Sequence, residues 1–106
     1  MPGPVFRKRN AGEEPARVTP LDHDRPLVAA ARRDPTRFEP LYRKYVAQVY
    51  NFAVYELGDH HAAEDATERT FLRALAALPR FEERADPADP VGSTFRVWLF
   101  RIARKL

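Results

Sequence analysis

The 106-residue sequence contains no cysteine and only four glycines. Without thiols the chain cannot form a disulfide, a thiolate nucleophile or a cysteine-ligated zinc site. The glycines are scattered, so the sequence has no glycine-rich loop of the kind that binds phosphate groups. No apolar run approaches the roughly 20 residues that a membrane-spanning helix needs. The basic N-terminus is not followed by an apolar stretch, which argues against a signal peptide, and we expect a cytoplasmic protein.

The charged residues are unevenly distributed along a chain whose overall composition is ordinary. Hydrophobic residues make up 44% and charged residues 31%, with a net charge of +3, as in many small soluble domains. The segment 95–106 carries four basic residues and no acidic one, whereas 64–68 carries three acidic residues. This segregation predicts two different partners on two different surfaces.

The spacing of apolar residues predicts an all-α fold. The first 23 residues hold four of the ten prolines and show no apolar period, so we expect a flexible N-terminal arm over 1–23 and a helical domain over 24–106. Steps of three and four residues predict a short helix over 24–34 and longer helices over 36–57, 59–78 and 94–106. No segment alternates with period two for long enough to form a strand. The predicted architecture is a compact bundle of three main helices plus a short leading helix.

Each of the three longer helices carries an apolar stripe that we predict to be buried. The stripe of the first consists of Phe38, Leu41, Tyr42, Tyr45, Val49, Phe52, Ala53 and Leu57. That of the second consists of Ala63, Ala66, Thr70, Phe71, Ala74, Leu75 and Leu78. That of the last consists of Phe95, Trp98, Leu99, Ile102, Ala103 and Leu106. Gly58 and Asp59 are predicted to end one helix and cap the next.

Residues able to carry out catalysis are few. No nucleophile is paired with a base and no two carboxylates share an apolar cleft, so we expect no catalytic residue and no enzyme activity. A metal site is conceivable, because His60 lies four residues before Glu64, and His61 has the same spacing to Asp65. The simpler interpretation is that the acidic residues occupy an early helical turn, where the helix dipole favours negative charge. We therefore expect no metal and no cofactor.

The last predicted helix combines aromatic and basic residues. Phe95 and Trp98 begin it, and the four basic residues of 95–106 lie among its apolar positions. Bases stack on aromatic rings while cations bind phosphates, so this pattern suits single-stranded nucleic acid. A core tryptophan beside a solvated charged face explains the same spacing equally well.

Several segments, taken in order, resemble the signature of a bacterial sigma factor. They read FEPLYRKY from Phe38, AEDATERTFLRA from Ala63, LPRF from Leu78 and FRVWLFRIAR from Phe95. Together they look like region 2 of an extracytoplasmic-function sigma factor, over about Leu27 to Leu106. Each segment alone is a weak match, whereas the ordered set is specific.

The resemblance implies a transcription initiation domain with two binding surfaces. The surface for the clamp helices of the RNA polymerase β′ subunit is implied to include Glu64, Asp65, Glu68, Arg69 and Leu72. The residues implied to contact or frame the melted, single-stranded minus-ten promoter DNA are Arg80, Phe81, Phe95, Arg96, Trp98, Arg101, Arg104 and Lys105. An anti-sigma factor is a further kind of partner that the resemblance implies, and neither a membrane nor a nucleotide cofactor is needed.

The sequence departs from the family pattern in ways that favour a second hypothesis. Glu68 stands where glutamine is usual, and Thr70 where a hydrophobic residue is usual. The connection 82–94 is long and carries four acidic residues against one arginine. An acidic loop along the strand would repel phosphates. The alternative is therefore a protein-interaction module with the same fold, which binds polymerase or an anti-sigma factor without recognising DNA.

The sequence stops at Leu106, before the helix-turn-helix with which the family reads the minus-thirty-five element. We therefore expect a separate or truncated domain that binds duplex promoter DNA weakly on its own.

Overall fold

The computed structural model describes residues 22–106, so the predicted arm lies outside the described residues except for Asp22 and His23. The helical elements are α1 (Arg25–Arg33), a 3-10 turn (Pro35–Phe38), α2 (Glu39–Leu57), α3 (His60–Ala77), a second 3-10 turn (Leu78–Arg80) and α4 (Phe95–Arg104). Within 22–106 the only β-type pairing is an isolated bridge between Asp22 and Ser93. The predicted all-α fold, with three main helices and a short leading one, is confirmed.

The helix boundaries follow from local chemistry. Gly58 ends α2 in the left-handed conformation, with a φ of 69°. The Asp59 carboxylate then accepts a hydrogen bond from the Ala62 N–H at 2.8 Å and caps α3. Asp34 stops α1 and caps the 3-10 turn by accepting from the Thr36 N–H at 3.1 Å. The boundary at Gly58 and Asp59 is therefore as predicted.

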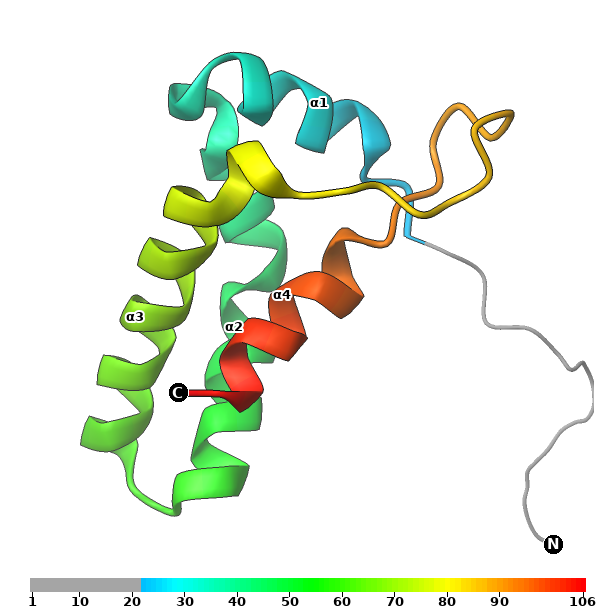
Figure 1. The fold of residues 1–106 in the computed structure, drawn as a ribbon. Helices are drawn as coiled ribbons and strands as arrows, with labels where there is room; N and C mark the ends of the chain where they lie inside the picture. The colour runs from blue at the N-terminus through cyan, green and yellow to red at the C-terminus, as the bar shows by residue number, and fades with distance from the viewer. Residues whose placement is uncertain (1–21) are drawn as a thin grey trace, which may run out of the picture.

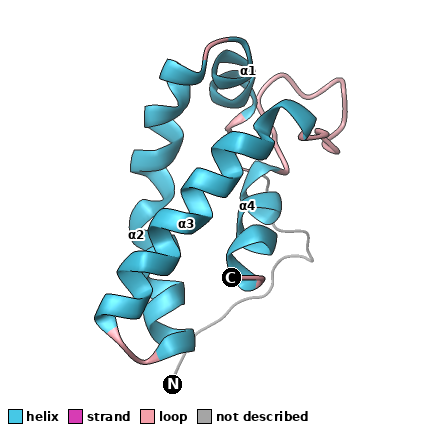
Figure 2. Cartoon of the chain, turned by 60° about the vertical axis from the view of Figure 1, so that its left-hand side comes forward, coloured by secondary structure: helices cyan, strands magenta, loops and turns pink. Residues whose placement is uncertain are grey.

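The longest helices form an antiparallel pair that the other elements cover on one side. α2 and α3 lie side by side, and α4 packs against both of them (Figures 1 and 2). Figure 1 shows α1 lying across the end of this pair, next to the last turn of α3. There the Arg32 guanidinium donates to the Pro79 carbonyl at 3.1 Å. Within residues 22–106, no helix covers the other long side of the α2–α3 pair (Figure 2).

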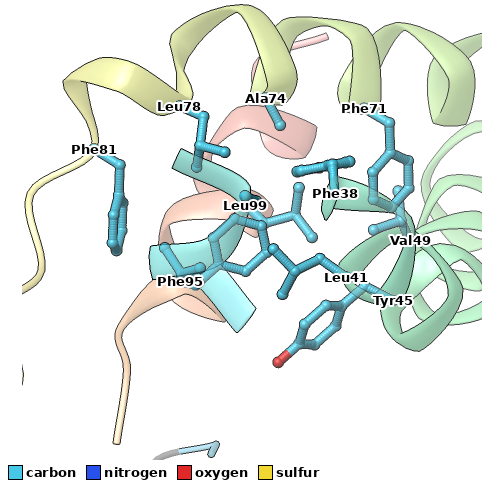
Figure 3. Close-up of a cluster of buried hydrophobic side chains, with 12 residues drawn as sticks. Phe38, Leu41, Tyr45, Val49, Phe71, Ala74, Leu78, Phe81, Phe95 and Leu99 are labelled. Atoms are coloured by element: carbon cyan, nitrogen blue, oxygen red, sulfur yellow. The ribbon is translucent and has the colours of Figure 1, made fainter. Parts of the chain in front are cut away.

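The core lies between α4 and the α2–α3 pair, and Phe95 is at its centre (Figure 3). Phe95 is completely buried, with its ring centroid 6.4 Å from that of Phe38, 6.1 Å from Phe81 and 5.9 Å from Tyr45. Such edge-on and tilted arrangements are the favourable ones for aromatic pairs. The ring cluster thus joins α4 to α2 and to the segment that follows α3.

The predicted stripes are partly wrong at their edges. Tyr42, Leu57 and Leu75 remain 43%, 47% and 37% exposed, although their spacing placed them in the core. Tyr42 and Leu75 line the groove on the side of the α2–α3 pair away from α4. Leu57 lies on the α4 side, where it lines a cavity beside the last turn of α4 with Ala103 and Arg104. Helical spacing identifies an apolar face but not how much of that face a neighbouring helix covers. It therefore overestimates the number of buried residues.

Thr70 is buried as predicted, and Thr67 is buried although it was not assigned to the stripe. Their hydroxyls donate to the carbonyls one turn earlier, of Ala66 and Ala63 respectively, at 2.7 Å in both cases. These bonds satisfy the buried hydroxyls, which explains how Thr70 is accommodated in the core.

Candidate nucleic-acid and protein interfaces

A small cleft opens between the start of α4 and the segment that follows α3. This α4 cleft has a volume of about 240 Å³, and its lining residues are Arg80, Phe81, Glu82, Arg84, Thr94, Val97, Trp98 and Arg101. Four of the eight residues predicted to bind DNA, namely Arg80, Phe81, Trp98 and Arg101, therefore lie together. The other four lining residues, which the sequence did not indicate as DNA-binding, are Glu82, Arg84, Thr94 and Val97.

The aromatic residues of this cleft differ in exposure. Trp98 is half-buried, and its ring centroid lies 5.2 Å from that of Phe81 and 5.6 Å from that of Phe95. Phe95 has no exposed surface and Phe81 is only 2% exposed. The predicted DNA-binding residues were expected either to contact the strand or to support those that do. Because Phe95 is completely buried in this conformation, it can only support its neighbours. Trp98 packs on the core and also lines the cleft, so both interpretations that its spacing allowed stay open.

The predicted basic residues do not form one surface. The Arg96 guanidinium lies 3.3 Å from the Gln48 Oε1 and 4.9 Å from the centre of the Phe100 ring, so it faces α2. Arg104 lines a separate cavity of about 130 Å³ at the other end of α4, and Lys105 follows the helix end. Because α4 turns through roughly 100° per residue, Arg96 and Arg101 lie about 140° apart around its axis. Only Arg101 of the α4 cations lines the cleft.

The acidic loop is folded onto itself. Asp89 accepts hydrogen bonds from the Val91 and Gly92 N–H groups at 3.0 Å, and these bonds lower the pKa of its carboxyl. Asp86 accepts from the Ala88 N–H at 2.9 Å. Most of the loop's carboxylates therefore face N–H groups of the loop itself. Glu82 is the one that lines the α4 cleft, where it pairs with Arg84 at 3.1 Å.

Arg25, the first residue of α1, anchors this loop. Its backbone N–H donates to the Val91 carbonyl at 3.0 Å. Its guanidinium donates to the carbonyls of Gly92 at 3.0 Å and of Asp86 at 2.9 Å. One residue thus binds three carbonyls of the loop and fixes it to the start of the domain.

A second and larger depression runs along the uncovered side of the α2–α3 pair. This α2–α3 groove has a volume of about 860 Å³, and its lining residues are Phe38, Glu39, Tyr42, Val46, Ala47, Tyr50, Glu64, Thr67, Glu68, Phe71, Leu72 and Leu75. Three residues of the predicted polymerase surface, Glu64, Glu68 and Leu72, are among them. The other two, Asp65 and Arg69, form an exposed ion pair at 3.5 Å on α3 outside the groove.

The histidines at the start of α3 have protein partners. The His60 Nδ1 lies 2.6 Å from the Tyr50 hydroxyl, and the two rings stack. The His61 Nδ1 lies 3.9 Å from a Glu64 carboxylate oxygen. Across residues 22–106, no three histidine or acidic side chains come close enough together to hold a metal ion. Among the same residues, no helix has both the length and the apolar character that crossing a membrane requires.

Comparison with known proteins identifies the family of the chain. The profile of the family described as Sigma-70 region 2 matches residues 41–106. The chain is 36% identical over 77 residues to the ECF RNA polymerase sigma factor SigC of Mycobacterium tuberculosis, covering 73% of this chain and 37% of that protein. It is 39% identical over 69 residues to the ECF RNA polymerase sigma factor BldN of Streptomyces coelicolor, covering 65% and 24%. The ECF RNA polymerase sigma factor SigM of Bacillus subtilis is 30% identical over 66 residues, covering 62% and 35%. The chain thus spans 24% to 37% of the length of these relatives.

Proposed function

The chain belongs to the sigma-70 family, as a region 2 domain of the extracytoplasmic-function type, and from this premise we propose that it acts in transcription initiation. In this proposal it docks on the clamp helices of the RNA polymerase β′ subunit and captures the melted minus-ten promoter strand. This proposal requires the domain to act in the cytoplasm, the location that we expect from the sequence. The observation that carries the DNA part is the α4 cleft, in which the half-buried Trp98 lies among arginines.

The composition of the α4 cleft suits an unpaired base. Trp98 offers a ring for stacking, which contributes about 1–3 kcal/mol per base, and Arg80, Arg84 and Arg101 supply cations for the adjoining phosphates. A volume of about 240 Å³ lies below the roughly 300–1,000 Å³ of sites for drug-sized ligands, which favours a single base. Because Phe81 and Phe95 hold Trp98 from behind, its ring loses little freedom when a base binds.

The α2–α3 groove supports the docking part of the proposal. Leu72 is 59% exposed, and the Tyr42 ring and the Leu75 side chain are exposed in the same groove. These three side chains give the groove an apolar surface. Glu64 and Glu68 add carboxylates, which can accept paired hydrogen bonds from arginine. An apolar stripe with acidic neighbours fits a helical partner that presents leucine-like and arginine side chains.

The DNA part is tested by binding a fluorescent single-stranded minus-ten oligonucleotide, with and without core polymerase. Trp98→Ala is expected to weaken binding about 5- to 100-fold, the loss of one stacked base. Arg101→Ala is expected to weaken it less, and Arg96→Ala serves as the matched control because it removes the same charge from the other face of α4. If Trp98→Ala and Arg101→Ala leave binding unchanged, the DNA-capture proposal fails and the protein-interaction alternative is favoured.

The docking part needs a separate measurement, the affinity for a β′ clamp-helix fragment. Leu72→Glu and Asp65→Arg are each expected to weaken binding at least tenfold, because they place a charge on the apolar surface or reverse one beside it. Glu56→Arg is the matched control, since it reverses an exposed charge on α2 that lines the cavity beside α4 and is not part of the predicted polymerase surface. Equal affinity of all three variants and the unmodified chain would remove α3 from the polymerase interface.

A further inference from the structure

We propose that Glu83 is a positioning residue for the α4 cleft, whose carboxylate fastens the start of the loop between α3 and α4 to its end. The inference rests on the proposed function only in taking the cleft as the site of the captured base. Glu83 does not line the cleft itself. It acts through its hydrogen-bond partners, two of which belong to the residues just before α4.

The Glu83 carboxylate is held by four hydrogen bonds. Its Oε1 accepts from the Ser93 hydroxyl at 2.6 Å. Its Oε2 accepts from the Thr94 N–H at 2.7 Å, the Thr94 hydroxyl at 3.0 Å and the Ala85 N–H at 3.2 Å. A carboxylate that accepts from this many donors is fixed in position, and so are the donors. Glu83 therefore joins two stretches of chain that are separated by the whole loop.

These bonds continue into the first turn of α4. The Ser93 hydroxyl, which donates to Glu83, accepts from the Phe95 N–H at 3.0 Å, and Ser93 is only 2% exposed. The Thr94 side chain makes no capping bond of its own to α4. The N-terminal N–H groups of a helix need acceptors, and here Glu83 and Ser93 supply them. The orientation of α4 relative to the loop is thus set through Glu83.

The same bonds also set the wall of the cleft. Thr94 and Arg84 both line the cleft, and the Arg84 N–H donates to the Thr94 hydroxyl at 3.1 Å. Because Glu83 holds that hydroxyl, it fixes the distance between the Arg84 side of the cleft and the Trp98 side. Apart from the bonds of Glu83, this single hydrogen bond is the only one described within residues 82–95 that connects Arg84 to the start of α4.

Glu82 provides an internal comparison. It precedes Glu83, lines the cleft and bonds only to Arg84. If charge alone mattered, neutralising either glutamate would strengthen DNA binding, because each repels phosphates. If Glu83 positions the cleft, the two substitutions act in opposite directions. The sign of the change therefore separates the two roles, whatever its size.

The first experiment measures Trp98 without DNA. Trp98 is the single tryptophan of the sequence, so intrinsic fluorescence reports on the cleft alone. Glu83→Gln in the full chain is expected to shift the emission to longer wavelength and to increase quenching by acrylamide. Glu82→Gln, which loses only its pairing with Arg84, is expected to change both less. Glu83→Gln with the spectrum and quenching of the unmodified chain would overturn the proposal, independently of whether DNA binds.

The second experiment measures the affinity for the single-stranded minus-ten oligonucleotide, with intact bases and with one base at a time removed. Glu82→Gln is expected to bind at least as tightly as the unmodified chain, and Glu83→Gln about 5- to 100-fold more weakly. The abasic position that weakens binding to the unmodified chain is expected to have no effect on Glu83→Gln. If Glu83→Gln instead weakens binding equally with every oligonucleotide, Glu83 only stabilises the fold and the positioning role is overturned.

The two experiments also separate this inference from the proposed function. If the unmodified chain fails to bind the oligonucleotide, the proposed function fails, while the fluorescence difference between Glu83→Gln and Glu82→Gln still decides whether Glu83 shapes the cleft. Circular dichroism at the assay temperature verifies that both variants are folded.

Discussion

The Tyr45 hydroxyl of α2 donates a hydrogen bond to the completely buried carboxylate of Asp24, just before α1. The other carboxylate oxygen accepts from the Lys44 Nζ at 2.5 Å. Burial, together with the hydrogen bond to Asp24, raises the pKa of the Tyr45 phenol, which therefore stays protonated and able to donate. Asp24 occupies the N-cap position of α1, but its side chain makes no capping bond and serves instead to hold α1 against α2. A buried carboxylate is tolerated only while its partners remain in place.

Tyr45→Phe is therefore expected to lower the free energy of unfolding by about 1–3 kcal/mol, because it leaves one oxygen of a buried carboxylate without its donor. The ring, and with it the packing on Phe95, is retained. Urea denaturation provides the measurement. Tyr55→Phe is the matched control on the same helix, because Tyr55 is 85% exposed, and we expect it to change stability by less than about 0.5 kcal/mol. Equal stability of the two variants would contradict the structural role of the Tyr45 hydroxyl.

Gly58 gives a prediction that depends on backbone conformation alone. Its φ of 69° disfavours residues with a Cβ, while no atom lies within 4 Å of the position that a Cβ would occupy. Gly58→Ala is expected to lower the free energy of unfolding by about 1–2 kcal/mol, from the cost of the left-handed conformation. Gly58→Asn should cost less, because asparagine tolerates that conformation better. Thermal and urea denaturation measure the free energy of unfolding. If Gly58→Ala is as stable as the unmodified chain, the turn must adopt another conformation that an alanine tolerates.

Glu83 also predicts a dependence of stability on pH. Burial opposes ionisation of its carboxyl, but the hydrogen bonds from Ser93 and Thr94 outweigh it and hold the pKa below the ordinary value. A lowered pKa in the folded state means that stability is present above the unfolded pKa, about 4.3, and is lost as the pH falls through the folded value. The stability difference between the unmodified chain and Glu83→Gln should be complete at pH 7 and decrease below about pH 4. A difference that is constant with pH would show that the charge of Glu83 is irrelevant to its bonds.

The salt dependence of oligonucleotide binding tests whether Arg101 contacts a phosphate of the bound strand while Arg96, on another face of α4, does not. A cation that neutralises one phosphate of a single strand contributes about 0.7 to the slope of log affinity against log salt concentration. Arg101→Ala is expected to reduce the magnitude of that slope by about this amount, and Arg96→Ala to leave it nearly unchanged, since Arg96 faces Gln48 and Phe100. Equal reductions in the two variants would mean that the strand follows both faces of α4.

The elements that sequence reasoning predicted best are those with local causes. The boundary at Gly58 and Asp59 depends on a left-handed residue followed by a cap, both of which are visible in two adjacent letters. The interior of each stripe, such as Leu41 and Leu99, follows from helical spacing. The exposure of Tyr42 and Leu75 could not be predicted, because it depends on which side of the α2–α3 pair the other helices cover.

The candidate site was predictable only in part for a related reason. The resemblance assigned Arg80, Trp98 and Arg101 to one DNA-binding surface, and all three line the α4 cleft. The resemblance also included Arg96, which helical geometry alone would have placed on a different face of α4 from Arg101. Glu83 was counted in the sequence as one more negative charge of the loop. Its role depends on the chain returning after ten residues to place Ser93 and Thr94 beside it. No periodic pattern encodes such a return.

The anchoring of the loop by Arg25 has a consequence for how the domain opens. The three carbonyls that Arg25 binds are 61 to 67 residues away along the chain, so these bonds exist only while α1 is docked. Local unfolding of α1 releases the loop, and the loop in turn cannot detach without weakening the first turn of α1. The two segments therefore form one cooperative unit, whose protected amide hydrogens are expected to exchange with a common free energy of opening although the bonds join residues 61 to 67 positions apart.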